Sequence, residues 1–479
     1  MIVLKVKNLR LKYPNGDRKI FDNLNIEIKD KEKVLLLGPS GSGKSTLLNV
    51  LSGIVPNLIE LPMKYDELDI DPNSGVIFQD PDTQFCMPKV YEELAFVLEN
   101  QKVPREDMDE QIKKALASVD LDVDNSTFVN NLSGGMKQKL AIVETILQKA
   151  DTLFLDEPTA MLDVQATADL WQRLIHLWTD QTVLIVEHKV EHIWHHVDRV
   201  ILMNYDGEII ADNTPEYILK HCESLLTEFG VWHPHAWDYA PIRKDLTPQY
   251  SNTLFKFQNG QIIRSKNTLF EVSELNIHPG EWITITGKNG AGKTTLLESM
   301  MQLVKYNGTM FYEKRLLKKI KDAAQNMYLV YQNPELQFIT NSVYDEINIH
   351  YNHLDKAKSK EETEHLLKLL HLEKVKHHHP FEISTGQKRR LSVATALSSK
   401  AEIVLLDEPT FGLDSHNTFQ LIKLFEERVK QGQTIVMVTH DPEIIHRYPT
   451  RRLGVENHKL LEMAGESNVK KKKKASYTC

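Results

Sequence analysis

The chain has 479 residues, a formal net charge of −8 at pH 7 and three cysteines. That length allows two or three domains, each able to bury its own core, and the acidic balance argues against a general nucleic-acid binder, which needs a basic face for phosphates. Cys86, Cys222 and Cys479 form no C-x-x-C pair, so they indicate no zinc site, iron–sulfur cluster or disulfide framework, and a reducing, cytoplasmic setting is expected.

The sequence contains no run of the roughly 18 to 20 apolar residues that span a bilayer. The N-terminal stretch MIVLKVKNLRLKY alternates polar and apolar residues like a strand and does not resemble a signal peptide. Any membrane role is therefore expected to be peripheral.

Residues 1 to about 30 are predicted to form short alternating strands with a P-N-G-D turn at 14–17, and Tyr13 is expected in this sheet. An apolar strand, a glycine loop and a helix follow in LLLGPSGSGKSTLL, residues 35–48. The pattern G-x-x-x-x-G-K-[ST] in this stretch recurs in TITGKNGAGKTTLL, residues 284–297. Both matches indicate phosphate loops.

A phosphate loop needs these residue types because its backbone N–H groups must wrap around polyphosphate oxygens, which glycine conformations permit at close range. The lysine adds positive charge, the following helix directs its N-terminus at the phosphates, and Ser45 or Thr294 can offer a hydroxyl to Mg²⁺. The predicted nucleotide-binding residues of the two loops are Gly38, Pro39, Ser40, Gly41, Ser42, Gly43, Lys44, Ser45 and Thr46, and Gly287, Lys288, Asn289, Gly290, Ala291, Gly292, Lys293, Thr294 and Thr295.

After the first loop, apolar residues three and four apart predict an inserted helical region between residues 85 and 131. There follow a helix that opens at Ser133, the strand TLFLDEP, a helix through Trp171 and Leu177, and the strand TVLIVEHK. This alternation predicts an α/β fold in which helices cover a parallel sheet.

The second half of the chain repeats the first. We expect a first domain at 1–228, a proline- and aromatic-rich linker at 229–250, a second domain at 251–466 and a basic tail at 467–479. The linker aromatics are expected to pack against a domain, and the five lysines at 470–474 fit a solvated end, with contact to anionic lipid as the alternative. Matched residues lie 249 to 253 positions apart, as in Lys44 and Lys293, Gln79 and Gln332, Ser133 and Ser384, Asp156 and Asp407, and His188 and His440.

Acidic pairs end two apolar strands, as Asp156-Glu157 in TLFLDEPTAMLD and Asp407-Glu408 in IVLLDEPTFGLD. The first carboxylate of each pair can hold Mg²⁺, directly or through water, and the second can orient or deprotonate an attacking water. Because each pair follows a phosphate loop at a matching distance, the pairs are predicted to be catalytic.

These motifs resemble the ATP-binding cassette (ABC) family over nearly the whole chain. The family's L-S-G-G-Q signature is similar to LSGGM at 132–136 and to ISTGQ at 383–387. The resemblance implies two tandem P-loop NTPase domains, each with a mostly parallel sheet core, an antiparallel β subdomain and an inserted helical subdomain. It also implies an ATPase with ATP and Mg²⁺ as cofactors, in which the two halves of the chain pair so that the signature of each closes over ATP held by the other.

The same resemblance assigns roles to single residues. Tyr13 is expected to stack on adenine, and Phe257 is the second candidate, with a core role as its alternative. The implied signature residues that bind nucleotide are Ser133, Gly134, Gly135, Ser384, Thr385, Gly386 and Gln387. The implied catalytic residues are Glu157, Glu408, the switch histidines His188 and His440, and the loop glutamines Gln79 and Gln332. The implied Mg²⁺ ligands are Ser45, Asp156, Gln79, Thr294, Asp407 and Gln332, and the implied domain-interface residues are Asp163 and Asp414.

Two positions depart from the family pattern. Met136 stands in place of the usual glutamine or glutamate, and Thr385 puts a branched side chain where glycine lets the backbone approach phosphate. Both glutamates and both switch histidines are present, so two hydrolytic sites are expected. The site that pairs Lys44 with Ser384 could be the slower one.

The segments VIFQDPDTQF and LVYQNPELQF, around Gln79 and Gln332, look like the F-Q-N-P-x-x-Q segment of ATPases from energy-coupling factor (ECF) importers. This resemblance implies import of a vitamin, a vitamin precursor or a transition-metal ion. It also implies a transmembrane coupling protein and a substrate-binding membrane protein as partners, no nucleic-acid partner, and a peripheral location on the cytoplasmic face of the membrane.

Two alternatives share the tandem organisation. The ATPase of a monosaccharide importer has a similar length, but its two halves usually diverge more than these paired glutamine segments. A soluble translation factor that acts on the ribosome joins its cassettes by a long charged helical pair, whereas the linker here is short and proline-rich.

Overall fold

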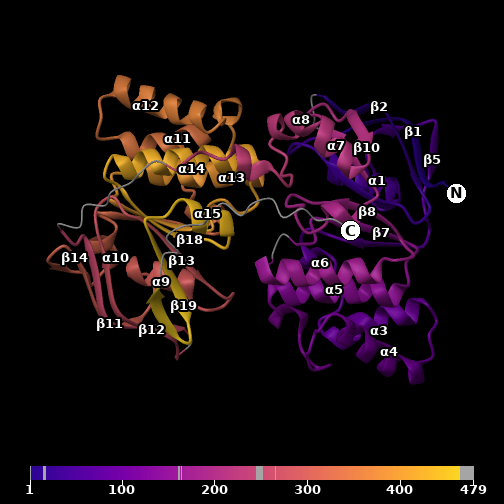
Figure 1. The fold of residues 1–479 in the computed structure, drawn as a ribbon, viewed down its shortest axis with the longest axis horizontal. Coiled ribbons are helices and arrows are strands. Elements are labelled where there is room, and N and C mark those ends of the chain that lie inside the picture. The colour runs from indigo at the N-terminus through magenta and orange to yellow at the C-terminus, as the bar shows by residue number, and fades with distance from the viewer. Residues whose placement is uncertain are drawn as a thin grey trace. The chain divides into compact units, whose positions relative to one another are not determined.

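The computed structural model describes residues 2–14, 18–159, 162, 164–243, 252–264 and 266–463. These residues form two compact units, one holding the described chain up to Ala240 and the other nearly all of it from Pro241 onwards (Figure 1). The basic tail and Asp163 lie outside the described residues.

The core of the first unit is a six-stranded sheet of order β10-β9-β3-β8-β7-β6, in which β9, β3, β8, β7 and β6 run parallel and β10 is antiparallel. Every residue of β7 and β8 is buried, as expected for strands covered on both faces. The predicted parallel sheet is therefore confirmed. The strands are β3 (Lys33–Leu37), β6 (Ser74–Ile77), β7 (Thr152–Asp156), β8 (Thr182–Val186), β9 (Arg199–Met203) and β10 (Ile209–Asn213).

The antiparallel subdomain of the first unit is a separate sheet in which β1 (Ile2–Lys12) pairs with β2 (Lys19–Lys29) and with the short strands β4 (Met63–Lys64) and β5 (Glu67–Asp69). Leu4, Val6, Leu9 and Leu11 of β1 are buried, an alternation that shifts by one residue between Val6 and Leu9, and this confirms the strand predicted at the N-terminus. Tyr13 directly follows β1 and is not part of it.

Helices α3 and α4 form the inserted helical region and pack against α5. Their apolar faces, including Leu94, Ile112 and Leu140, share one hydrophobic core with the central sheet. The first-unit helices are α1 (Lys44–Leu51), α2 (Ile54–Asn57), α3 (Val90–Asn100), α4 (Arg105–Ser118), α5 (Gly134–Gln148), α6 (Val164–Leu177), α7 (Pro215–His221) and α8 (Glu223–Glu228).

The second unit repeats this plan. Its strand order β19-β13-β18-β17-β16 matches β9-β3-β8-β7-β6, but here the antiparallel strands join the same ten-stranded sheet through a contact of β12 with β20 at Glu271 and Lys459. The strands are β11 (Phe255–Arg264), β12 (Asn267–Ile277), β13 (Trp282–Gly287), β14 (Tyr306–Tyr312), β15 (Arg315–Leu316), β16 (Met327–Val330), β17 (Ile403–Asp407), β18 (Thr434–Val438), β19 (Arg451–Glu456) and β20 (Lys459–Glu462).

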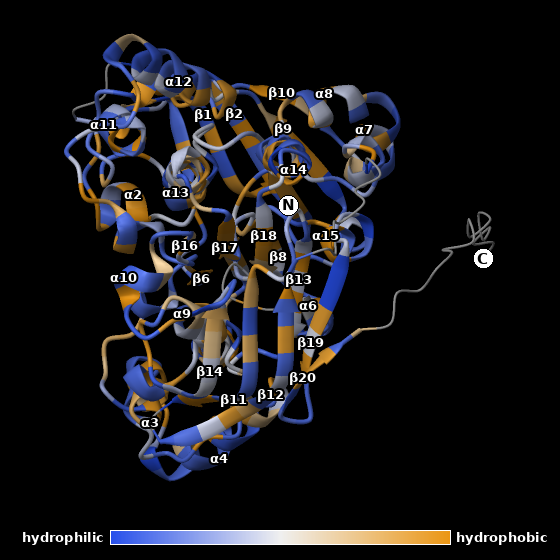
Figure 2. Cartoon of the chain, turned by 90° about the vertical axis from the view of Figure 1, so that its left-hand side faces the viewer, coloured by the Kyte–Doolittle hydropathy of each residue, from blue (hydrophilic) through white to orange (hydrophobic). Residues whose placement is uncertain are grey.

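Helices α11 and α12 form the second inserted helical region and pack on each other, with α11 against α13. The hydrophobic β17 is orange in Figure 2, whereas the outer helix α12 is mostly blue. The second-unit helices are α9 (Lys293–Met300), α10 (Ile320–Ala323), α11 (Val343–Asn348), α12 (Lys356–Leu369), α13 (Thr385–Ser398), α14 (Ser415–Lys430) and α15 (Pro442–Arg447).

The described part of the predicted linker is irregular apart from a short 3₁₀ turn at Ala236–Tyr239. Trp232 is only 3% exposed and its ring lies 5.4 Å from that of Trp237. The Lys189 ammonium lies 5.6 Å from the centre of the Trp232 ring, within cation–π range. The prediction that the linker aromatics pack against a domain is thus confirmed for Trp232.

Candidate functional site

The first phosphate loop lies between β3 and α1 and has the backbone that its glycines predict. Gly43 has φ 94°, and a Cβ atom there would lie 2.8 Å from Ile20, so only glycine fits this turn. Lys44 folds back over the loop, and its Nζ donates to the carbonyl oxygens of Gly38 (2.8 Å) and Pro39 (3.0 Å). Burial lowers the pKa of Lys44, so an anion in the loop would relieve a desolvated charge.

The second phosphate loop, between β13 and α9, reproduces this geometry. The Nζ of Lys293 donates to the carbonyl oxygens of Gly287 (2.8 Å) and Lys288 (3.0 Å). Gly292 has φ 99° and stands just before α9. Both loops therefore present a lysine and a helix N-terminus to the same space, which suits a polyphosphate.

The first acid of each pair lies beside the hydroxyl residue of its loop. Ser45 Oγ donates to Asp156 Oδ1 (3.0 Å), and Thr294 Oγ1 donates to Asp407 Oδ2 (2.7 Å). Burial raises the pKa of Asp156 to about 6 and also raises that of Asp407. A hydroxyl and a carboxylate that converge in this way form an oxygen donor set that fits Mg²⁺.

Three predicted catalytic residues of the first unit meet at one carboxylate. Glu157 accepts a hydrogen bond from Gln79 Nε2 (2.9 Å) and forms an ion pair with His188 Nε2 (2.9 Å). These residues follow the neighbouring strands β6, β7 and β8, whose carboxyl ends meet at one edge of the sheet. Glu157 also has a left-handed backbone, with φ 48°, which is uncommon for a residue other than glycine.

The pairing with His188 sets the charge of this site. Burial alone would raise the pKa of Glu157, but the hydrogen bond and charge of His188 bring it below the ordinary value. Burial alone would lower the pKa of His188, and Glu157 raises it above the ordinary value. The structure thus favours an ionised Glu157 beside a protonated His188.

The corresponding group in the second unit is looser. Glu408 has the same left-handed backbone, with φ 48°, but its Oε1 lies 3.7 Å from His440 Nε2. Gln332, like Gln79, is exposed. The two units therefore share the residues of the site and differ in how closely histidine and glutamate approach.

The predicted signature serines cap helices in both units. Ser133 Oγ accepts from the backbone N–H of Met136 (3.4 Å) at the start of α5, and Ser384 Oγ accepts from Gln387 N–H (3.4 Å) at the start of α13. Only the second helix has the reciprocal bond, from Ser384 N–H to Gln387 Oε1 (2.9 Å). The side chain of Met136 has no oxygen that could accept this bond. Methionine at this position therefore removes half of the capping box.

Helix α5 begins with Gly134 and Gly135, and helix α13 begins with Thr385 and Gly386. Asp414 directly precedes α14. Its first-unit counterpart Asp163 lies outside the described residues.

The two predicted stacking aromatics have different surroundings. Tyr13 is 42% exposed, and its hydroxyl is hydrogen-bonded to Thr46 Oγ1 (2.8 Å) in α1, beside the phosphate loop. Phe257 is fully buried in β11, where its ring packs edge-on against Tyr306 at 5.5 Å. Phe257 is therefore a core residue, the alternative considered for it, because a buried ring offers no open face to a base.

Sequence reasoning missed a buried residue near the second acidic pair. Arg389 of α13 is 4% exposed, donates to the Tyr331 carbonyl oxygen (3.3 Å) and has its pKa lowered to about 10 by burial. Asp407 and Glu408 raise that pKa, so the guanidinium acts electrostatically on the pair. Its counterpart in α5 is the neutral Gln138, and aligning the two signature helices would have revealed this difference.

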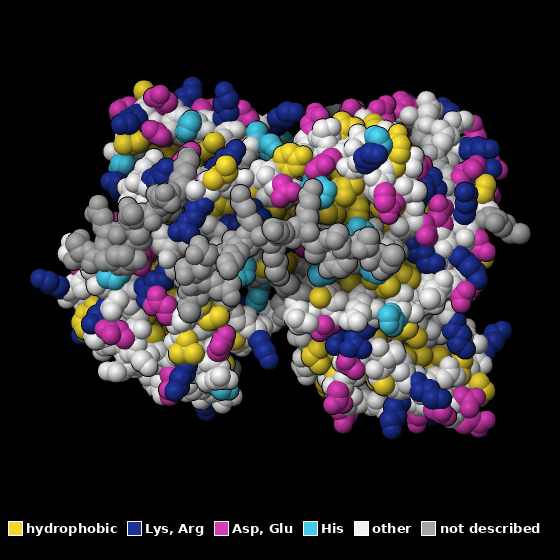
Figure 3. All heavy atoms as spheres, in the orientation of Figure 1, with side chains coloured by type: hydrophobic (Ala, Val, Ile, Leu, Met, Phe, Trp, Pro, Cys, Tyr) yellow, Lys and Arg dark blue, Asp and Glu magenta, His cyan; other side chains and the backbone are white. Residues whose placement is uncertain are grey.

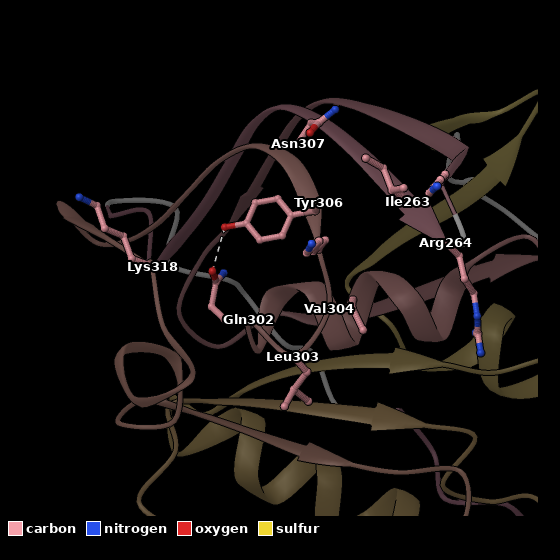
Figure 4. Close-up of a pocket in the computed structure, with 10 residues that line it drawn as sticks. Ile263, Arg264, Gln302, Leu303, Val304, Tyr306, Asn307 and Lys318 are labelled. Carbon is pink, nitrogen blue, oxygen red and sulfur yellow. Dashed lines mark hydrogen bonds between the residues drawn. The ribbon is translucent and has the colours of Figure 1, made fainter.

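The second unit has a basic pocket of about 720 Å³ beyond the C-terminal end of α9 (Figure 4). Tyr306 donates to Gln302 Oε1 (3.0 Å) inside it. The side chain of Arg264 extends away from Tyr306, Gln302 and Lys318 at the pocket edge (Figure 4). The lining residues are Ile263, Arg264, Lys266, Gln302, Leu303, Val304, Lys305, Tyr306, Asn307 and Lys318.

Comparison with known sequences agrees with this geometry. The profile described as ABC transporter matches residues 21–160 and 270–411. "Putative HMP/thiamine import ATP-binding protein YkoD" of Bacillus subtilis (strain 168) is 31% identical over 490 residues, covering 93% of this chain and 88% of that protein. A "Putative ABC transporter ATP-binding protein" of Streptococcus pneumoniae serotype 4 is 30% identical over 506 residues, covering 96% of this chain and 90% of that protein.

Solved structures share the fold. The archaeal ribosome recycling factor aABCE1, in complex with ribosomal stalk protein aP1, has a TM-score of 0.65 at 20% identity and covers 95% of this chain and 90% of that one. The structure of RNase-L Inhibitor has a TM-score of 0.63 at 21% identity, and the match covers 96% of this chain and 90% of that one. Within the residues that our structure describes, no helix has the length and apolarity needed to cross a membrane.

Proposed function

The chain belongs to the ABC transporter family and is an ATPase with two ATP-binding cassettes, and we propose that it is the energy-coupling subunit of an ECF-type importer. It would bind at the cytoplasmic face of a membrane to a transmembrane coupling protein. ATP hydrolysis by this chain is supported by the contacts that Gln79 and His188 make with Glu157 beside a phosphate loop.

We propose the following roles at the first site. Lys44 and the N-terminus of α1 bind the phosphates, and Glu157 orients and deprotonates the attacking water. Gln79 holds the second oxygen of Glu157 (2.9 Å), which fixes the carboxylate for that task. His188, raised in pKa by Glu157, carries positive charge toward the terminal phosphate.

Mg²⁺ would be held by Ser45 and Asp156 at the first site and by Thr294 and Asp407 at the second. When bound, it would neutralise phosphate charge during hydrolysis. The serine-capped helices α5 and α13, with Asp163 and Asp414, are proposed to complete the sites across the two paired halves.

The coupling surface is proposed to lie beside the segment that follows Gln332. Leu336 is 69% exposed and Ile339 is 77% exposed, and the half-exposed ring of Phe381 lies 6.3 Å from that of Phe338. Such a cluster of apolar side chains at a surface is typical of a protein contact. A short helix of a membrane-embedded partner would cover it.

The segment around Gln84 in the first unit has the same local design. Asp80 caps the turn Pro81–Thr83, as Asn333 caps Pro334–Gln337 in the second unit. Phe128 is half exposed and pairs with Lys89, whose ammonium lies 6.0 Å from the centre of the Phe128 ring. We propose that this segment also contacts the partner, although Thr83 and Cys86 stand where the second unit has Leu336 and Ile339.

The nature of the transported compound is proposed from similarity alone. The Bacillus subtilis relative is named for import of HMP and thiamine, so a vitamin, a vitamin precursor or a metal ion is the proposed cargo, taken up with a substrate-binding membrane protein. Similarity to the ribosome recycling factor concerns the fold. Acidic and basic side chains of the described residues are interspersed on the face drawn in Figure 3.

Co-purification tests this proposal. The tagged full chain, expressed from its native genome, should retain integral membrane proteins in mild detergent. Ile339→Lys should lose them, because a charge in the apolar contact is costly to desolvate. Ile320→Lys changes a half-exposed isoleucine elsewhere in the second unit and should retain them. Recovery of ribosomal proteins instead of membrane proteins would contradict the proposal.

A further inference from the structure

The end of β11 in the second unit is equivalent to the end of β1 in the first. Leu11 of β1 pairs with Phe21 of β2, and Ile262 of β11 pairs with Phe270 of β12. On the other side, β4 and β14 pair antiparallel with the same two positions. The two sheets can therefore be superposed strand for strand at Leu11 and Ile262.

The phosphate loops support the same superposition. A Cβ atom on Gly43 would lie 2.9 Å from the Phe21 ring, and one on Gly292 would lie 3.2 Å from the Phe270 ring. Each phenylalanine thus packs directly against the final glycine of its loop. The register equivalence therefore holds where the nucleotide would bind.

Tyr13 lies two residues after Leu11, and Arg264 lies two residues after Ile262. The hydroxyl of Tyr13 is fixed to Thr46 of α1 (2.8 Å), so an exposed flat ring stands beside the helix that begins at the phosphates. The base of a nucleotide is joined to its phosphates through one ribose, so the base lies close to the phosphate loop. The Tyr13 ring stands where it can stack on that base.

Arg264 has an exposed side chain in the equivalent place. Its charge acts on Glu298 of α9, five residues after the loop lysine, opposing the rise in pKa that burial causes there. Figure 4 shows the side chain turned away from the other labelled polar residues of the basic pocket. The guanidinium therefore lies on the α9 side of the pocket.

We propose that the second cassette holds the base of its nucleotide against the guanidinium plane of Arg264, where the first cassette uses the ring of Tyr13. This inference rests on the proposed function. A guanidinium is planar, always charged and able to stack on aromatic rings. Phe257, the other candidate, is fully buried in the core. The two sites thus bind the same nucleotide by different chemistry at the base.

The test uses the full chain with Lys44→Ala, so that the second loop dominates binding, and measures affinity by calorimetry with Mg²⁺-ATP and with ribose 5-triphosphate. Arg264→Ala should weaken ATP binding about five- to tenfold and leave ribose triphosphate, which lacks a base, within twofold. Arg264→Tyr should restore ATP affinity, whereas Arg264→Lys, which keeps the charge without the plane, should not. Lys266→Ala removes another exposed cation of the pocket and should change neither affinity.

Equal losses for both ligands would overturn the inference, because the effect would be one of charge. It would also be overturned if Arg264→Ala bound ATP normally while Lys293→Ala abolished binding, and the proposed function would then stand. If Lys293→Ala also bound ATP normally, the proposed function itself would fail. Circular dichroism of each variant checks that the exposed substitutions leave the fold intact.

Discussion

Among single residues, the two catalytic groups differ in the distance between glutamate and switch histidine. The distance from Glu157 Oε1 to His188 Nε2 is 2.9 Å, and the distance from Glu408 Oε1 to His440 Nε2 is 3.7 Å. Both glutamates keep the same strained backbone, with φ 48°. A glutamate held in this way in both units suggests that both are kept ready for catalysis, because strain persists only where the surroundings enforce it.

We therefore expect both sites to hydrolyse ATP. Glu157→Gln and Glu408→Gln should each lower the steady-state ATPase rate, and the double variant should lose about 100-fold or more, the usual worth of a general base. Phosphate release by the chain with its membrane partner measures this. Unchanged turnover in Glu157→Gln together with its loss in Glu408→Gln would contradict equal competence of the sites.

Glu144 of α5 makes stability depend on pH. It is 7% exposed and accepts a hydrogen bond from Gln84 Nε2 (2.6 Å), and burial raises its pKa to about 8. The folded state thus keeps a proton that the unfolded chain releases above about pH 4.3. The stability contributed by this neutral group is present below that pH and is lost as the pH rises through about 8.

Glu144→Gln should remove this pH dependence, because an amide oxygen can still accept from Gln84 and carries no charge. The variant should gain about 3 kcal/mol over the natural chain between pH 5.5 and pH 8.5, as linkage requires for a shift of this size. Urea unfolding of both proteins at the two pH values measures the difference. Parallel pH profiles would show that Glu144 is ionised in the folded protein.

At the scale of elements, the two signature helices differ in their capping. Gln387→Met in α13 reproduces Met136 of α5 and removes the bond from Ser384 N–H (2.9 Å). We expect a loss of about 0.5–1 kcal/mol in the free energy of unfolding. Denaturant titration measures it, with Gln387→Glu as the control that retains the capping box. Equal stability of both variants would mean that water replaces the bond without cost.

Elements with strong periodicity could be predicted from the sequence. The stretch VYEELAFVLEN coincides with α3 (Val90–Asn100), and the buried strands β7 and β17 lie in the apolar runs before the acidic pairs. Short strands such as β4 and β15 could not be predicted, because two residues carry no periodicity and their pairing depends on tertiary contacts.

The same limit applied to the candidate site. The family resemblance predicted catalytic roles for Gln79, Glu157 and His188, and the structure brings these three residues together after the ends of neighbouring parallel strands. The resemblance could not predict that Arg389 lies near Asp407, because that position depends on how α13 packs. For Phe257 the sequence left two alternatives open, stacking on the base or a place in the core, and its burial in β11 favours the core.

At the scale of the whole molecule, the duplicated sequence gives two units with the same central strand order. Each unit carries one phosphate loop, one acidic pair and one serine-capped signature helix. The proposed pairing of the halves requires that each ATP contact the signature helix of the other half. This requirement can be tested without a structure of the closed state, because the two sites can be silenced one at a time.

In the Glu408→Gln background, the remaining hydrolysis should depend on Lys44, Glu157 and, across the pair, Ser384. Ser384→Asp keeps a good helix cap but adds a negative charge facing phosphate, and should reduce this remaining rate about 100-fold. Ser133→Asp in the same background should leave it within about twofold, and the Glu157→Gln background should reverse the two results. If each cassette instead used its own signature helix, Ser133→Asp would silence the site that contains Glu157, and the pairing of the halves would be wrong.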